Sequence, residues 1–293
     1  MKHFPSIFLS LLLPLAVAAQ SVQIQDGAIR AEFSVSDSTK VYFSQGNLQY
    51  QASTNTWRFA EHQWDYVGTQ TPDENGYYGG TINGSDNANI SETYEGWIDL
   101  FGWGTSGYNG KNPYMTSTSY SDYGDGSNDI AGTNYDWGVY NKVSNGGNQA
   151  GMWRTLTSSE WNYLISGRAQ ANRLMGHGRV NNVNGLILLP DSWATETPSS
   201  VRFTYDPGNY STNVYSLDEW AVMQSYGTVF LPAAGYRNGT GVNYVGSYGY
   251  YWSSSANDSN FVYYPFFYSN DAYTNYYGSR VNGLSVRLVQ DVK

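Results

Sequence analysis

The chain has 293 residues, enough for one large domain or two small ones with a substantial hydrophobic core. It contains no cysteine, which excludes disulfides, thiolate metal sites and cysteine nucleophiles. Only 13% of the residues are charged, about half of the usual share, whereas 28 are tyrosines, 10 tryptophans and 32 glycines. The net charge is −9, and Lys and Arg are not clustered as nucleic-acid or anionic-membrane binding requires, so we expect neither partner.

Residues 1–19 have the pattern of an export signal. Lys2 gives a basic start, an apolar run covers residues 7–17, and the small residues Val17 and Ala19 precede the expected cleavage point. The apolar run is too short to span a bilayer with ease, although an N-terminal anchor is the alternative. We expect the mature protein to begin at residue 20, to have no membrane span, and to be secreted, surface-attached or periplasmic.

The rest of the chain reads as one domain at residues 35–293, preceded by an N-terminal extension at residues 20–34. No linker-like run of Pro, Ser or charge divides it. Strand-forming residues predict hairpin strands at 41–50, 57–59 and 63–67.

From residue 68 to 148 the sequence is mostly Gly, Asn, Ser, Thr and Asp, without helix or strand periodicity. A structureless segment of this length is unusual in a compact domain, so buried aromatic residues must hold it in place. We predict long ordered loops pinned by Trp97, Phe101, Trp103 and Trp137.

Two capping boxes, Thr157 with Glu160 and Ser216 with Glu219, predict two short helices. Apolar residues follow each box at helical spacing, and Gly227 is placed to end the second helix. Short strands are predicted at residues 185–190, 228–232, 250–253, 261–268 and 284–289. The fold class is therefore α+β, with short antiparallel strands, two short helices and long ordered loops.

Residue types used in catalysis are scarce. His62 and His177 are the only histidines beyond residue 19 and lie far apart, which leaves little material for a histidine metal site or a Ser-His-Asp relay. We therefore expect a protein that is not an enzyme and needs no cofactor. For the Gly-rich loop around Asp122, Asp125 and Asp129 we favour a solvated, turn-rich structure, because the EF-hand spacing is absent, and a calcium ion is the alternative.

Residues 236–280 contain 11 Tyr, 7 Ser, 6 Asn and 5 Gly, with no Lys and no Glu. This mixture is typical of antibody paratopes, where Tyr gives rigid contact area and Ser, Asn and Gly give adaptable hydrogen bonds. A tyrosine-rich sheet surface without a ligand is the alternative. We expect a protein or glycan ligand to bind within residues 236–282. The candidate contact residues are Tyr236, Asn238, Asn243, Tyr244, Tyr248, Asn257, Asn260, Tyr264, Tyr268, Asn270, Tyr273, Asn275 and Tyr276.

Several segments resemble known families. Residues 151–164, Gly-Met-Trp-Arg-Thr-Leu-Thr-Ser-Ser-Glu-Trp-Asn-Tyr-Leu, are similar to the R-L-P-T-x-x-E-W-E-Y segment of formylglycine-generating-enzyme-like proteins, which have a variant C-type lectin fold. Residues 249–255 and 280–289, with Tyr-Trp-Ser-Ser and Gly-Leu-Ser-Val-Arg-Leu-Val, resemble the ending of the Fibrobacter major paralogous domain and of secreted proteins of gut Bacteroidetes. Together with residues 41–50 and 136–140, the likeness covers most of residues 35–289.

The resemblance implies a C-type-lectin-like fold in which Trp153, Trp161, Trp252 and residues 285–289 form the framework. It implies no formylglycine-generating activity, because those enzymes bind copper through a cysteine pair that this chain lacks. Variable proteins of diversity-generating retroelements use the same fold, with a C-terminal binding face diversified at Asn codons, and residues 236–282 look like such a region. A structural or adhesive component of a cell-surface assembly, or a degenerate enzyme of this superfamily, are the alternatives.

Overall fold

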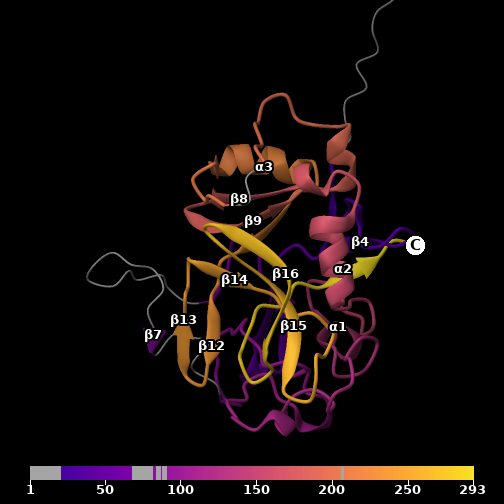
Figure 1. The fold of residues 1–293 in the computed structure, drawn as a ribbon. Helices are drawn as coiled ribbons and strands as arrows, with labels where there is room; N and C mark the ends of the chain where they lie inside the picture. Colours follow the sequence, from indigo (N-terminus) through magenta and orange to yellow (C-terminus); the bar gives the residue numbers. More distant parts are fainter. Residues whose placement is uncertain (1–20, 68–81, 84–86, 88–90, 206–207) are drawn as a thin grey trace, which may run out of the picture.

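A computed structural model describes residues 21–67, 82–83, 87, 91–205 and 208–293. The expected export signal at residues 1–19 lies outside the described residues. Within them the fold is α+β, with three short α-helices and six small sheets (Figure 1). No helix in the described ranges has the length and apolar character needed to cross a membrane.

The helices and strands are short throughout. The α-helices are α1 (Trp137–Tyr140), α2 (Ser158–Asn162) and α3 (Leu217–Ser225), and a π-helical turn, η5 (Tyr163–Gly167), continues α2. Single 3-10 turns are η1 (Ala52–Thr54), η3 (Tyr108–Gly110), η4 (Tyr120–Asp122), η6 (Ala171–Arg173) and η7 (Asp191–Ala194). The first strands are β1 (Ile24–Gln25), β2 (Ala28–Ile29), β3 (Phe33–Ser34), β4 (Lys40–Phe43), β5 (Leu48–Gln51), β6 (Thr56–Phe59) and β7 (Ile82–Asn83). The later strands are β8 (Met175–Val180), β9 (Val183–Leu188), β10 (Asn213–Tyr215), β11 (Val229–Pro232), β12 (Tyr236–Asn238), β13 (Gly241–Asn243), β14 (Tyr248–Tyr250), β15 (Phe261–Tyr268), β16 (Asp271–Ser279) and β17 (Val289–Asp291).

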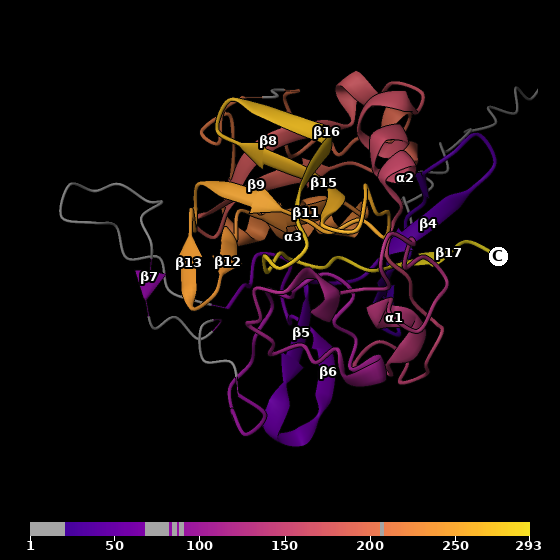
Figure 2. The same cartoon turned by 60° about the horizontal axis from the view of Figure 1, so that its bottom comes forward.

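The sheets stack from one end of the molecule to the other. The largest has the order β10-β8-β9-β11 and lies with α3 at the top of Figure 1. Below it come β14-β15-β16 and the hairpin β12-β13, which also pairs with β7. The loop-rich segment after residue 91 fills the bottom, where Figure 2 shows the β5-β6 hairpin beside it. Strand β4 pairs with both β3 and β17, which joins the two ends of the described chain.

Both predicted capping boxes are present. The backbone N of Glu160 donates to Thr157 Oγ1 at 3.2 Å, and the backbone N of Thr157 donates to Glu160 Oε2 at 2.8 Å. Ser216 and Glu219 make the same pair of bonds at 3.3 and 2.9 Å. These caps satisfy backbone donors that a helix start leaves unpaired. The short helix α1 was not predicted; there the Asp136 side chain accepts from the backbone N of Gly138 at 3.2 Å.

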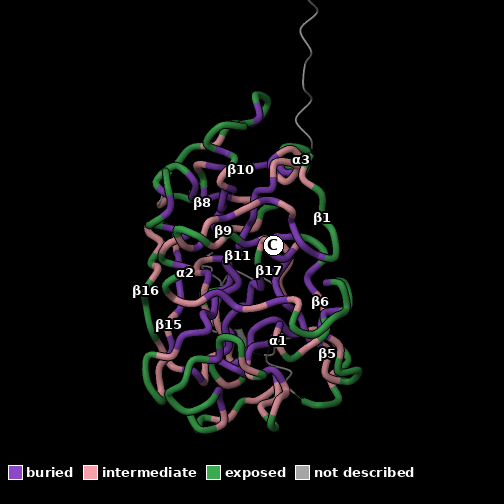
Figure 3. The backbone as a smooth tube through the Cα atoms, turned by 90° about the vertical axis from the view of Figure 1, so that its right-hand side faces the viewer, coloured by how far each residue is buried: buried purple, intermediate pink, exposed green. Residues whose placement is uncertain are grey.

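Buried tryptophans hold the loop-rich segment, as predicted. Phe101, Trp103 and Trp137 are fully buried, whereas Trp97 is partly exposed and packs under the Arg58 guanidinium, 3.7 Å from its ring centre. The indole Nε1 of Trp103 donates to the carbonyl of Ser253 at 2.8 Å. The remainder of the predicted loop, at 68–81, 84–86 and 88–90, lies outside the described residues. Figure 3 shows buried backbone through the middle of the molecule and exposed backbone in the outer loops and β16.

The N-terminal residues of the described chain belong to this interior. Ala28 and Ile29 in β2 and Phe33 in β3 are fully buried, and the Phe33 ring lies edge-on to Phe43 at 5.0 Å. Residues 21–34 therefore pack with the rest of the fold.

Several strand predictions were wrong in detail. Residues 41–50 do not form a hairpin, because β4 pairs with β3 and β17 while β5 pairs with β6. Residues 63–67 are turn and coil, in which the buried Gln63 amide bonds to the backbone of Thr228 and Phe230 at 2.9 and 2.7 Å.

The predicted strand at 284–289 is regular only from Val289 onward. Leu284 and Ser285 form single bridges to Phe101 and Tyr251, and the Val286 carbonyl accepts from Leu48 N at 2.9 Å. Successive backbone groups thus pair with different segments, so no ladder of consecutive residues forms. The longest strand of the described residues, β16, was not predicted, because its Asp, Asn and Gly residues have low strand propensity and it depends on pairing with β15.

Candidate functional site

One side of the β14-β15-β16 sheet carries a continuous layer of aromatic rings. Residues two apart on a strand point to the same side, which places Tyr248 with Tyr250 on β14 and Phe266 with Tyr268 on β15. Their rings stack, with centroids 5.2 Å apart for Tyr248 and Tyr268 and 5.7 Å apart for Tyr250 and Phe266. We define the tyrosine face by its ring residues, which are Tyr236, Tyr244, Tyr248, Tyr250, Tyr264, Phe266, Tyr268, Tyr273 and Tyr276.

A bulge in β16 brings Tyr273 and Tyr276 onto this face. Tyr264 pairs with Tyr276 and Phe266 with Tyr273, so two residues of β16 lie opposite the single residue Pro265. Proline has no N–H to give to a sheet ladder, which explains the irregularity at this point. Two residues that are three positions apart on a regular strand point to opposite sides of the sheet. Because of the extra residue, the rings of Tyr273 and Tyr276 both contact the Phe266 ring, with centroids 4.8 and 4.9 Å from it.

The β12-β13 hairpin supplies the other edge of the face. Tyr236 stacks on Tyr244 at 6.0 Å, and Tyr244 contacts Tyr248 of the sheet at 4.8 Å. Tyr244 has φ of 58°, a left-handed backbone conformation that bulky residues rarely adopt. Backbone strain of this kind costs about 1–3 kcal/mol and is concentrated at functional sites.

A pocket of about 260 Å³ opens between the hairpin and the sheet. Its walls are Tyr236, Tyr244, Tyr250, Tyr264, Phe266 and Tyr276, together with Asn282 and Leu284. Leu284 and Tyr264 are only 2% and 7% exposed, whereas Tyr244 and Tyr276 are 40% and 51% exposed. The pocket therefore has a buried, apolar base, an exposed tyrosine rim and no charged side chain in its lining.

Four phenols of the face, those of Tyr236, Tyr250, Tyr264 and Tyr273, have raised pKa values and are neutral at physiological pH. Burial raises the pKa of Tyr236, Tyr250 and Tyr264 above the ordinary value for tyrosine. A hydrogen bond to Tyr268 raises the pKa of Tyr273 to about 12. These groups can accordingly donate and accept hydrogen bonds, but they are not bases or nucleophiles at pH 7.

A buried layer supports the face from behind. The ring of Phe267 stacks on Tyr251 at 6.2 Å, and both residues are buried. A Cβ on Gly249, which pairs with Phe267, would come within 2.1 Å of that ring, so only glycine allows β14 to lie this close. The rings that face solvent therefore rest on fixed packing, which limits their movement.

The structure brings all the predicted tyrosines together on the tyrosine face and leaves all six predicted asparagines outside the pocket. Tyr250, Phe266, Asn282 and Leu284 line the pocket but were not predicted. For Tyr250 and Phe266 the signal was available, since each is two residues from a predicted tyrosine on a strand. Asn282 and Leu284 come from the irregular C-terminal segment, and nothing in the sequence places them here.

The predicted asparagines lie at other points of the same region. Asn257 and Asn260 lie in the turn before β15, where Asp258 Oδ1 accepts from the backbone N of Asn260 at 2.7 Å and Asp258 Oδ2 accepts from Asn257 Nδ2 at 3.3 Å. The remaining positions are the end of β12 for Asn238, β13 for Asn243, the β15-β16 turn for Asn270 and the bulge for Asn275.

The three aspartates considered for calcium are engaged separately. Asp122 accepts from the Ser117 hydroxyl, Asp125 from Asn128 Nδ2 at 3.4 Å and Asp129 from the backbone N of Ala256 at 2.7 Å. Over the part of the chain that the structure describes, no three His, Cys, Asp or Glu side chains gather so that they could hold a metal ion.

Comparison with known proteins gives one match. A family model described as a domain of unknown function (DUF8237) matches residues 193–289, about a third of the chain, which include the whole tyrosine face. No curated protein and no solved structure matches the chain. Because the family description names no activity, the function is inferred from the site itself.

Proposed function

We propose that this is an exported, non-catalytic binding protein that recognises a protein or glycan ligand through the tyrosine face, and that a neutral glycan is the better fit of the two. The observation that carries the proposal is the pocket walled by aromatic rings with an uncharged lining. Concave sites with mainly aromatic walls and a few placed polar groups are the usual form of small-ligand sites. Export is inferred from the signal pattern of residues 1–19.

The chemistry of the lining favours a sugar. The face of a tyrosine ring is partly negative, so it attracts the weakly positive C–H groups of a sugar ring, and the phenol hydroxyls can bond to sugar hydroxyls. Asn282 adds an amide with both a donor and an acceptor. A charged ligand would find no opposite charge among the lining residues.

Rigidity of the rings supports binding rather than an inert sheet surface. Each tyrosine loses few rotatable bonds on binding, and those of the face are already stacked on one another, so little conformational entropy remains to be lost. The framework residues of the C-type-lectin-like resemblance are separate from this face: Trp153, Trp161 and Trp252 are at most 1% exposed. Apart from Tyr264, which packs on Trp252, contact residues can therefore change without disturbing these framework residues, as programmed diversification would need.

The test is a glycan-array screen of residues 20–293, followed by affinity measurement with any hit. Tyr276→Ala and Tyr250→Ala remove one rim ring and one wall ring, and we expect each to weaken binding by about tenfold or more. Tyr140→Ala is the matched control, because Tyr140 is 42% exposed and lies outside the face. Unchanged affinity in both face variants would exclude the tyrosine face as the site. Binding only to a protein ligand, lost in the same variants, would keep the face and reject the glycan.

A further inference from the structure

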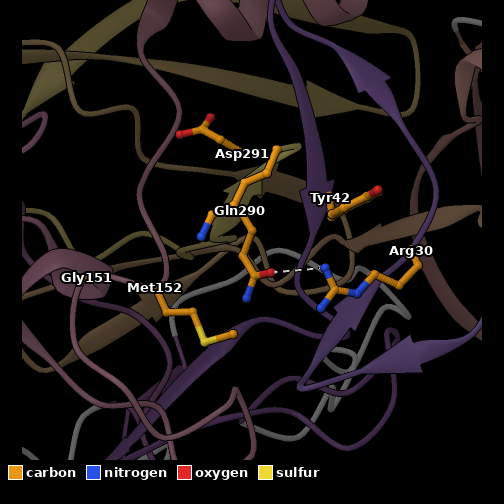
Figure 4. Close-up of a pocket in the computed structure, with 7 residues that line it drawn as sticks. Arg30, Tyr42, Gly151, Met152, Gln290 and Asp291 are labelled. Atoms are coloured by element: carbon orange, nitrogen blue, oxygen red, sulfur yellow. Dashed lines mark hydrogen bonds between the residues drawn. The ribbon is translucent and has the colours of Figure 1, made fainter.

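A second pocket, of about 500 Å³, lies between β2, β4 and β17 (Figure 4). It shares no lining residue with the pocket of the tyrosine face, and Figure 1 places β4 and β17 on the opposite side of the molecule from β12 and β13. It is lined by Arg30, Tyr42, Gly151, Met152, Gln290, Asp291 and Lys293. Nothing in the proposed function uses these residues.

Two buried donors in this pocket have no partner. Arg30 Nη1 donates to Gln290 Oε1 at 3.5 Å, as the dashed line in Figure 4 marks. This contact fixes the amide orientation, because the reverse would set the amide NH₂ against the guanidinium. Arg30 Nε and Gln290 Nε2 are then both buried without a hydrogen-bond partner among the described residues, and Gln290 is only 7% exposed. Among the buried side-chain atoms that have no hydrogen-bond partner in the described residues, these two belong to residues that line this pocket, where a ligand with acceptor oxygens would satisfy both.

The positive charge of Arg30 is a second reason to expect a ligand with acceptor oxygens in this pocket. The Arg30 guanidinium lies 5.1 Å above the Tyr42 ring, a contact that positions the cation without neutralising it. The nearby carboxylate of Asp291 is held by Arg154, whose Nε and Nη2 donate to it at 3.0 and 2.7 Å. Arg30 is therefore a cation without a carboxylate partner among the described residues. Such a cation suits an anionic ligand even in a chain whose net charge is −9.

We propose that this pocket binds the carboxylate of a small organic acid, with Arg30 and Gln290 donating to its oxygens and Met152 and Tyr42 contacting its apolar part. A carboxylate offers two coplanar oxygens, one of which can accept from the Arg30 Nε–H and the other from the Gln290 amide NH₂. An acidic sugar and the C-terminal carboxylate of a peptide both carry this group. The proposal is independent of the proposed function, because it concerns a different surface.

Isothermal titration or NMR titration of residues 20–293 tests it with two probes, D-glucuronate and N-acetyl-L-leucine. Their uncharged counterparts, D-glucose and N-acetyl-L-leucinamide, are the matched ligand controls. We expect saturable millimolar binding of at least one acid and none of its counterpart, and the acid that binds identifies the source. If neither acid binds saturably, or if the uncharged counterparts bind equally, the proposal is wrong.

Two variants locate the binding. Arg30→Gln removes the cation and Gln290→Glu places a like charge beside the ligand, and we expect each to weaken binding of the acid by about tenfold or more. Tyr276→Ala, on the tyrosine face, is expected to leave it unchanged. Thermal unfolding of each variant establishes that it is folded. Wild-type affinity in folded Arg30→Gln and Gln290→Glu would overturn the assignment, whatever the outcome of the glycan screen.

Discussion

The loop-rich segment at residues 91–148 and the tyrosine face both depend on aromatic rings, but they use them in opposite ways. In the loop-rich segment the rings of Trp103 and Trp137 are fully buried, whereas in the face Tyr273 and Tyr276 are 41% and 51% exposed. The Nε1 of Trp103 and that of Trp252 also donate to backbone carbonyls across the interior, at 2.8 and 2.6 Å. Rings tied to the backbone hold irregular chain in place, and rings stacked only on one another leave their outer surface free for a ligand.

Replacing Trp252 by Ala should have the largest effect on stability. Trp252 is fully buried, donates to the Phe101 carbonyl and packs on Tyr264, so its loss removes a large core side chain and leaves a carbonyl without its donor. We expect the free energy of unfolding to fall by about 3–5 kcal/mol, measured by chemical denaturation. Trp97→Ala, at a partly exposed tryptophan, is the control and should cost clearly less. Equal losses would remove the distinction between buried and exposed rings.

The pH dependence of stability should come from the loop-rich segment. Burial raises the pKa of Asp99 from 3.8 to about 7 and that of Asp136 from 3.8 to about 6. At a pH between the unfolded-state pKa of 3.8 and these raised values, the folded state keeps protons that the unfolded state has released. The free energy of unfolding therefore falls as the pH rises through this range. We expect a fall of roughly 1–4 kcal/mol between about pH 4 and pH 8, measured by denaturation at each pH.

Asp99→Asn tests whether this carboxyl group causes the pH dependence of the free energy of unfolding. The amide does not ionise, so the free energy of unfolding of the variant should depend less steeply on pH. The amide NH₂ must also face one of the two groups that donate to Asp99, Val67 N or Asn87 Nδ2, and this clash will lower the stability at acid pH. Asp218→Asn, at an exposed position in the first turn of α3, is the control and should keep the wild-type slope. A wild-type slope in Asp99→Asn would show that this carboxyl is ionised in the folded protein.

The smallest effect on stability is expected at the rim of the tyrosine face. Tyr276→Ser removes a side chain that is 51% exposed, and the free energy of unfolding should change by no more than about 0.5 kcal/mol. Tyr264→Ser, on the same sheet but 7% exposed and packed on Trp252, is the comparison and should cost more than that. Thermal unfolding of both variants measures the difference. A large loss in Tyr276→Ser would mean that the rim rings support the fold.

Local signals in the sequence predicted local structure well. The capping boxes are complete within four residues, and the alternation of aromatic residues fixes β15 without reference to the rest of the chain. The seven predicted tyrosines of the face lie together because they occur on neighbouring strands of a continuous stretch of chain.

Local signals in the sequence could not predict features that depend on pairing between segments far apart in the chain. β16 exists because β15 pairs with it, and the segment after Asn282 is irregular because its partners come from five places in the chain. Arg30 and Gln290 are 260 positions apart, and only the pairing of β4 with β17 brings them to one pocket. No sequence motif around Arg30 or around Gln290 predicts this pocket.

The bulge in β16 sets different limits on the composition and the length of this segment. Replacing one residue of β16 by another changes the side chain at that position and leaves the other rings of the face in place. Deleting Thr274 or Asn275 would leave one residue of β16 opposite Pro265, and Tyr273 and Tyr276 would stay on the same side of the sheet, because residues two apart on a regular strand point the same way. The bulge is therefore the place where this strand can lose one residue without moving a ring off the tyrosine face.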